Sequence, residues 1–159
     1  MPTHYKGKEK EKRALNALIP LFRAVDTLAG LAAARIERHG LTAGQFGVLE
    51  TLLHLGPMCQ REIAAKLLRS GGNTTLVVDN LEKLGLVRRE RRRDDRRMIT
   101  VRLTPHGRKA ITKIFREHAA ATAREMSALT VAEQEELRRL CRKLGRSQKE
   151  ERHDSNSKV

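Results

Sequence analysis

The sequence predicts a mainly α-helical fold with one small β-hairpin, and three observations support this prediction. Apolar residues recur every three or four positions through most of the chain, as they do in helices that bury one face. A helix that ends at Gly85 leads directly into a strand that begins at Leu86 and Val87. A second strand, 99–103, alternates apolar Ile99, Val101 and Leu103 with polar Thr100 and Arg102.

The N-terminal part predicts a mobile arm followed by a long helix. Residues 1–9 are polar and carry lysines, so we expect them to be mobile. The next apolar positions step by three and four residues as in a heptad seam: Leu15, Leu18, Phe22, Val25, Ala29, Ala32 and Ile36. This pattern indicates either association with another helix, including a helix of a second chain, or one surface helix of a globular domain. Pro20 interrupts it, so the helix either kinks there or starts there, and Gly40 ends it.

The next two helices form a predicted helix-turn-helix. Thr42 and Gln45 make a capping box that opens a helix to about Leu55, broken by Gly56 and Pro57. A helix over 60–68 follows, with Cys59 as its N-cap before Glu62. The residues expected to face inward are Phe46, Leu49, Leu52 and Leu53 in the first helix and Ile63, Ala64, Leu67 and Leu68 in the second.

A third helix and the hairpin together predict contact with DNA. The helix follows a small polar segment, 70–73, and turns Thr74, Val77, Val78 and Leu81 inward. Between the strands, 88–97 holds seven arginines against Glu90, Asp94 and Asp95, a net charge of +4, and we expect this segment to be a turn. A helix fits the major groove, and an arginine-rich tip reaches the neighbouring backbone or minor groove. The alternative is a solvated hairpin whose charges only keep the protein soluble.

The C-terminal part predicts two more helices. Thr104 caps the first and Pro105 occupies its first turn, and Thr130 with Glu133 forms a capping box for the second. The inner stripe of the first is Ile111, Ile114, Phe115, His118 and Met126, and that of the second is Leu137, Leu140, Cys141 and Leu144. Cys141 is therefore expected to be inert core, and 146–159 to fray. We expect one domain, with dimerisation helices over 10–40 and 104–145 and a DNA-binding region over 41–103.

Composition indicates the class of partner. The chain has 159 residues, a net charge of +14 and a pI near 10.7, which favours a polyanion. Aromatic residues are only 3%, too few for stacking on single-stranded bases. The longest apolar runs are a few residues, so we expect no membrane span and a cytoplasmic protein. Cys59 and Cys141 do not make a disulfide scaffold.

Three segments resemble the multiple antibiotic resistance regulator (MarR) family of bacterial transcription factors. They are LTAGQFGVLETL at 41–52, NTTLVVDNLEKLGLVRR at 73–89 and DRRMITVRLTPHG at 95–107. The resemblance implies a homodimeric winged helix-turn-helix whose first and last helices interlock between chains. It also implies binding to a pseudo-palindromic operator on double-stranded DNA, usually as a repressor released by a small-molecule effector or by oxidation.

The resemblance also implies roles for single residues. Asp95 and Arg97 match the family's wing pair, in which the arginine enters the minor groove and the aspartate orients the guanidinium. In the first half of the recognition helix, Asn80 suits adenine and Leu76 a thymine methyl, beside outward-facing Asn73 and Thr75. Ser70 and Arg93 are expected to hold phosphates.

The chain departs from the family's redox branch, which has a cysteine in the first helix. Cys59 at a helix N-terminus is either a sensor or a small half-buried structural residue. Nothing predicts a metal site, a cofactor or an enzyme, since the histidines lack ligand spacing and no nucleophile–base pair occurs. The competing readings are a redox regulator acting through Cys59 and a nonspecific architectural or RNA-binding protein.

Overall fold

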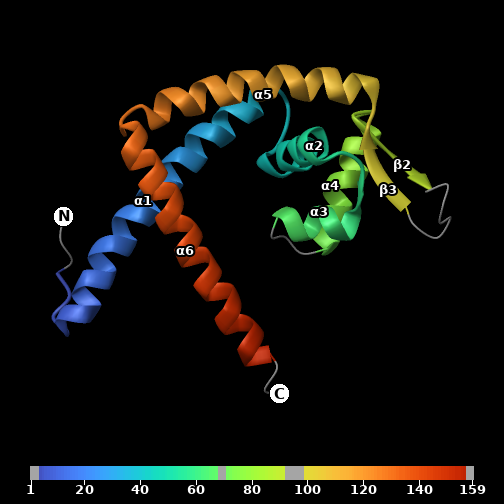
Figure 1. Cartoon of the computed structure of the whole chain (residues 1–159). Helices are drawn as coiled ribbons and strands as arrows, with labels where there is room; N and C mark the ends of the chain where they lie inside the picture. Colours follow the sequence, from blue (N-terminus) through green and yellow to red (C-terminus); the bar gives the residue numbers. More distant parts are fainter. Residues whose placement is uncertain (1–3, 68–70, 92–98, 157–159) are drawn as a thin grey trace. The chain divides into compact units, whose positions relative to one another are not determined.

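A computed structural model of the chain describes residues 4–67, 71–91 and 99–156. Two compact units are present, 1–119 and 120–159. The predicted mainly α fold with a small hairpin is confirmed, and the elements can be followed in Figure 1. Their order is α1 (Glu9–Glu37), α2 (Ala43–Leu55), β1 (Met58–Cys59), α3 (Gln60–Leu67), α4 (Gly71–Lys83), β2 (Val87–Arg91), β3 (Ile99–Leu103), α5 (Pro105–Met126) and α6 (Val131–Asn156).

Helix α1 begins well before Pro20 and continues through it. The Lys8 backbone N–H donates to Glu11 Oε2 at 3.1 Å, and the Tyr5 hydroxyl donates to the same oxygen at 3.1 Å. These bonds satisfy a free donor of the first turn, so the helix starts at Glu9. The alternative in which Pro20 starts the helix is therefore wrong.

Helix α1 is also long and apolar enough to cross a membrane, by length and composition alone. Its most apolar 18-residue window has a mean hydropathy of 1.5, although no apolar run is long. The average is high because Leu and Ala are frequent in this helix, although they form no continuous apolar run. Arg23 and Asp26 lie within the helix, and each charge at the centre of a membrane span costs about 2.5–3.5 kcal/mol.

The core of the first unit lies between α2, α3, α4, the sheet and the start of α5. The Thr42–Gln45 capping box is confirmed, with Gln45 N–H to Thr42 Oγ1 at 3.2 Å and Thr42 N–H to Gln45 Oε1 at 2.8 Å. The inward faces of α2 and α4 are confirmed, and Ile63 and Ala64 of α3 are buried; Leu68 lies outside the described residues. Fully buried side chains include Val48, Leu49, Leu52, Ile63, Thr74, Val78, Leu81, Val87, Val101 and Ile111.

The sheet has three antiparallel strands in the order β1–β3–β2. The predicted β3 is confirmed, but the turn expected over 88–97 is wrong at its start, because β2 continues to Arg91 and pairs with Ile99. The sequence analysis missed β1, which pairs Met58 with Val101 and Cys59 with Thr100. Residues 92–98 at the tip lie outside the described part of the chain.

Two tight junctions connect the recognition helix, the ribbon and α5. Gly85 has φ 68°, as predicted for a C-cap, and bonds from Gly85 N–H to Glu82 O and from Leu86 N–H to Leu81 O close α4. Thr104 Oγ1 accepts the Gly107 N–H at 2.9 Å and donates to Gly85 O at 2.7 Å, so the cap of α5 also holds the end of α4. A Cβ at Gly107 would lie 1.9 Å from the Leu86 carbonyl oxygen, so only glycine fits there.

In the second unit, the predicted capping box of α6 is confirmed. The Thr130 N–H donates to Glu133 Oε2 at 2.7 Å, and hydrogen bonds from the Thr130 backbone and hydroxyl lower the pKa of Glu133. Two expectations are wrong. The helix continues to Asn156 instead of fraying from 146, since its Lys, Glu, Arg and Gln residues favour helix. Cys141 is exposed in the single chain and is not part of a buried core.

Candidate nucleic-acid interface

The outward face of α4 presents three of the four predicted base-reading residues to solvent. Asn73 and Thr75 are exposed, and Leu76 is 60% exposed. Asn80 is half-buried and lies past the midpoint of α4, so the expectation that it shares the first half of the helix is wrong. The four other predicted contacts, Ser70, Arg93, Asp95 and Arg97, lie outside the described residues.

Arg89 of β2 ties the ribbon to the recognition helix. Its guanidinium pairs with Asp79 Oδ1 and Glu82 Oε2, both at 2.5 Å, and its backbone N–H donates to Glu82 Oε1 at 2.9 Å. Asp79 and Glu82 are one turn apart on α4, so the planar fork spans both carboxylates. This contact fixes the orientation of the ribbon relative to α4.

The same guanidinium also reaches α3, the helix that precedes the recognition helix α4. Arg89 Nε donates to Gln60 Oε1 at 3.3 Å, and Gln60 Nε2 donates to Thr75 Oγ1 at 3.2 Å. Gln60 opens α3, whereas Thr75 lies on the exposed face of α4. One network therefore joins α3, α4 and β2 and holds a predicted DNA-contacting side chain. We call Gln60, Asp79, Glu82 and Arg89 the clamp.

The charges of the clamp suit a surface that meets a polyanion. Burial alone would lower the pKa of Arg89, but its hydrogen bonds to Asp79 and Glu82 and their negative charges raise it, so the guanidinium stays protonated. In return, Arg89 offsets one of the two negative charges that Asp79 and Glu82 place on the recognition helix, which weakens their repulsion of phosphates. The acidic residues of α4 are thus compatible with DNA contact.

The clamp was not predicted from the sequence, because residues 88–97 have the composition of one charged turn. Arg89 is one of seven arginines there, and sequence alone does not separate it from its neighbours. Two features of the sequence could have indicated the clamp. Asp79 and Glu82 share a helix face, and Gly85 turns the chain back toward that face within a few residues.

Cys59 lies at the junction of β1 and α3 and is half-buried. Its backbone N–H donates to Glu62 Oε2 at 2.7 Å, so a carboxylate already occupies the N-terminus of α3. Within the described part of the chain, no group of three His, Cys, Asp or Glu side chains could hold a metal ion.

Comparison with known sequences identifies one matching family and several similar transcriptional regulators. Residues 41–99 match the profile of the MarR family. The HTH-type transcriptional regulator YkoM of Bacillus subtilis is 34% identical over 87% of this chain and 90% of the relative. MhqR of the same organism, another HTH-type transcriptional regulator, is 32% identical over 87% and 96%. The transcriptional repressor MdtR of B. subtilis is 30% identical over 70% and 72%.

Solved structures agree with this assignment at the level of the fold. AbsC, a MarR family transcriptional regulator from Streptomyces coelicolor, superposes with a TM-score of 0.80 at 20% identity, covering 91% of this chain and 99% of that chain. A probable transcriptional regulator from Pseudomonas aeruginosa has a TM-score of 0.69 at 31% identity, covering 79% and 94%.

Proposed function

This chain belongs to the MarR family of winged helix-turn-helix transcriptional regulators, and we propose that it acts as a homodimeric repressor of a pseudo-palindromic operator. It is a DNA-binding regulator and not an enzyme. The repressor role is supported by the name of one relative, MdtR. Release by a small-molecule effector is part of the proposal.

The observation that most directly supports this function is the exposed face of α4, which the clamp holds in place. An exposed leucine in the middle of a polar helix face exposes apolar area to water for no structural gain, whereas a thymine methyl would cover it. Leu76 therefore supports base contact, together with Asn73 and Thr75 on the same face. Asn80 is half-buried and lies at the far edge of this surface, and in our proposal it contacts adenine there.

The ribbon leads to the predicted wing contacts. In our proposal Arg97 enters the minor groove with its guanidinium oriented by Asp95, while Ser70 and Arg93 hold phosphates. The two strands that carry this tip are fixed to α4 through Arg89. The described strands of the ribbon therefore have a defined position relative to the major-groove contacts on α4.

The proposed dimer is supported by uncovered apolar surface. In the single chain, Phe22 of α1 is 59% exposed and Val25 is 53% exposed, and Leu140 and Leu144 of α6 are about half exposed at 46% and 50%. Both helices lie in the segments, 10–40 and 104–145, that we propose as dimerisation helices. A second copy of the chain would remove this surface from water.

Selection of operator DNA from a random library tests the proposal. A repressor dimer should enrich an inverted repeat and bind it at least about a thousandfold more tightly than scrambled duplex at the same salt. The matched pair is Leu76→Ala on the exposed face and Leu84→Ala, also exposed but past the end of α4. Only the first should lose discrimination. Equal affinity for selected and scrambled duplexes would favour a nonspecific architectural protein instead.

A further inference from the structure

The side-chain amide of Gln60 lies between the ribbon and the recognition helix, and its two partners determine its orientation. Arg89 Nε donates to Gln60 Oε1 at 3.3 Å. Every nitrogen of a guanidinium is a donor, so the amide oxygen has to face Arg89 and the NH2 group has to face away from it. That NH2 group donates to Thr75 Oγ1 at 3.2 Å. The opposite orientation of the amide would place two donors against each other.

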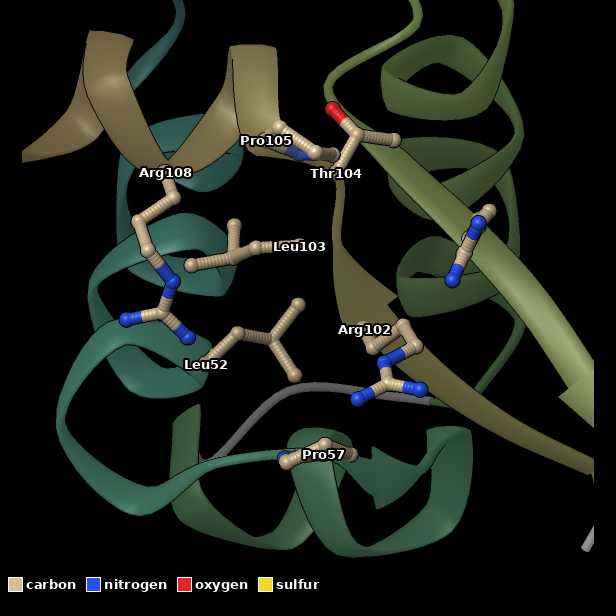
Figure 2. A pocket seen from close by; sticks show the side chains of 8 residues that line it. Leu52, Pro57, Arg102, Leu103, Thr104, Pro105 and Arg108 are labelled. Carbon is tan, nitrogen blue, oxygen red and sulfur yellow. The ribbon is translucent and has the colours of Figure 1, made fainter.

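The backbone that carries Gln60 is held by the sheet. Gln60 is the first residue of α3 and follows β1 directly, and both residues of that strand pair with β3. Pro57, just before β1, lines a pocket together with Leu52 and Leu103, as Figure 2 shows, so the chain leading into β1 borders the core. The position of the Gln60 side chain is therefore set by strand pairing at its root and by Arg89 at its end.

The bond from Gln60 gives Thr75 a defined orientation on the exposed face of α4. A threonine in a helix has two common rotamers, and the bond to Gln60 favours one of them. Oγ1 and the methyl group are both attached to Cβ, so holding Oγ1 against Gln60 also fixes the direction of the methyl. Thr75 therefore presents one arrangement of its side chain to whatever lies against α4.

The NH2 group of Gln60 has a second hydrogen, which no described residue accepts. An amide nitrogen offers two donors, and Thr75 takes one of them. Gln60 is only half-buried, so the second hydrogen is accessible to an acceptor from outside the chain. The next residue, Arg61, is exposed and has no ion pair within the described part of the chain, and its charge offsets that of Glu62 in the same turn. A donor beside a cation suits a phosphate oxygen.

We propose that Gln60 joins a phosphate contact to base recognition by Thr75. One amide hydrogen holds Thr75 Oγ1, and the other donates to a phosphate oxygen of the DNA backbone next to α4. Phosphate contacts fix the register of a protein on the duplex, and here the register is fixed at a side chain that reads a base. Gln60 is thus a positioning residue that affects specificity without touching a base. This inference rests on the proposed function.

Gln60→Met is the first test, because methionine keeps the length of the side chain and removes both donors. Operator affinity should fall by about tenfold and affinity for scrambled duplex by no more than about threefold, since only the operator contact depends on Thr75. The salt slope should stay the same, because a neutral side chain releases no counterion. Unchanged operator affinity, or equal losses on both duplexes, overturns the proposal.

Gln60→Glu separates positioning from stability. A glutamate pairs with Arg89 at least as well as glutamine does, but it has no hydrogen for Thr75 or for a phosphate. The urea midpoint should therefore not fall, whereas operator affinity should fall by at least about tenfold. Gln45→Glu is the matched control, because it adds the same charge and a glutamate still accepts the Thr42 N–H of the capping box. If both glutamate variants lose the same operator affinity, only net charge matters and the proposal is wrong.

Modified operators locate the phosphate. Methylphosphonates replace the phosphates of one half-site one at a time, which removes the charge and one acceptor oxygen. At one position the unmodified chain should lose about tenfold in affinity, and Gln60→Met should lose at most about twofold. Thr75→Val should likewise cost less operator affinity in the Gln60→Met background than in the unmodified chain. Absence of such a position, or additive losses in the double variant, overturns the joint role of Gln60.

Failure of this proposal differs from failure of the proposed function. An unmodified chain that binds selected and scrambled duplexes equally contradicts both. An unmodified chain that discriminates between them, with a Gln60→Met variant that discriminates equally well, contradicts only the role of Gln60.

Discussion

At the scale of single residues, what the sequence could predict depends on whether a side chain acts locally. The outward face of α4 follows from periodicity, and the structure places Asn73, Thr75 and Leu76 there. Arg89 could not be identified in this way, because its role depends on Asp79 and Glu82, two carboxylates on the preceding helix α4. Neighbouring arginines have the same chemistry but different partners.

Arg89→Ala should loosen the ribbon and the recognition helix together. The variant leaves Asp79 and Glu82 without their cation, so we expect the free energy of unfolding to fall by about 1–3 kcal/mol in urea titrations. Operator affinity should fall by roughly tenfold, because the two DNA-contacting elements lose their fixed geometry. Arg89→Lys should be intermediate, since an ammonium does not span both carboxylates.

The control for this experiment is Arg116→Ala, an exposed arginine outside the clamp and the ribbon. It should leave stability within about 0.5 kcal/mol of the unmodified chain. If Arg89→Ala loses stability but binds operator normally, the clamp only stabilises the fold and does not position the ribbon for DNA.

At the tip of the ribbon, Arg97 and Arg93 should differ in what they contribute. Arg97→Ala should weaken operator binding by about 1–3 kcal/mol per wing and narrow the gap to random DNA. Arg93→Ala should weaken both duplexes similarly and reduce the salt slope by about one unit, as expected for a phosphate contact. Asp95→Ala should resemble Arg97→Ala but be milder, because the guanidinium remains.

Salt titrations of each variant against operator and scrambled duplex make this comparison. Equal losses for Arg97→Ala and Arg93→Ala on both duplexes would show that the wing is only an electrostatic anchor. Specificity would then depend on the exposed face of α4.

At the scale of elements, the helix ends that could be predicted from the sequence were those with a local cap. The starts of α2 and α6 and the end of α4 were predicted because Thr42, Thr130 and Gly85 each act within a few residues. Strand β1 could not be predicted, since two residues show no alternation and their pairing partners, 100 and 101, are some 40 positions away. The full length of β2 could not be predicted for the same reason. Its pairing with β3 outweighs its charged, turn-like composition.

Gly107→Ala should disrupt the junction between the ribbon and α5. The added Cβ would lie 1.9 Å from the Leu86 carbonyl oxygen, which is backbone and cannot rotate away. We expect the free energy of unfolding to fall by about 1–3 kcal/mol or more. Gly47→Ala is the matched control, since its nearest contact is the flexible Leu67 Cδ2 at 3.2 Å and its helix gains propensity. Similar losses in both variants would contradict a specific close approach at Gly107.

Cys59→Ser should keep DNA binding if this residue is structural. The backbone N–H of residue 59 keeps its bond to Glu62, and serine is the better N-cap, so stability should be unchanged or rise by several tenths of a kcal/mol. Operator binding is measured with and without peroxide, with Cys141→Ser as the control because Cys141 is the other cysteine of the chain. Peroxide sensitivity that disappears only in Cys59→Ser would establish a redox sensor.

At the scale of the whole molecule, net charge and uncovered apolar surface have separate uses. The charge of +14 explains attraction to DNA of any sequence, and it is spread along the chain rather than confined to one site. The exposed apolar residues on α1 lie outside the DNA-contacting surface that we propose, which is formed by α4 and the ribbon. Their exposure, 59% for Phe22 and 53% for Val25, needs another partner.

Assembly is therefore the decisive test at this scale. The unmodified chain should sediment as a dimer of the 18.0 kDa protomer at micromolar concentration, and its stability should rise with protein concentration. Phe22→Asp puts a carboxylate into the proposed seam and should give monomers or unfolded chains, because an unpaired charge is costly in a buried interface. Thr27→Asp, exposed on the opposite side of the same helix, should remain dimeric. A folded, monomeric unmodified chain that binds operator would overturn the dimer, and α1 would then need a different partner, such as the membrane that its hydropathy also permits.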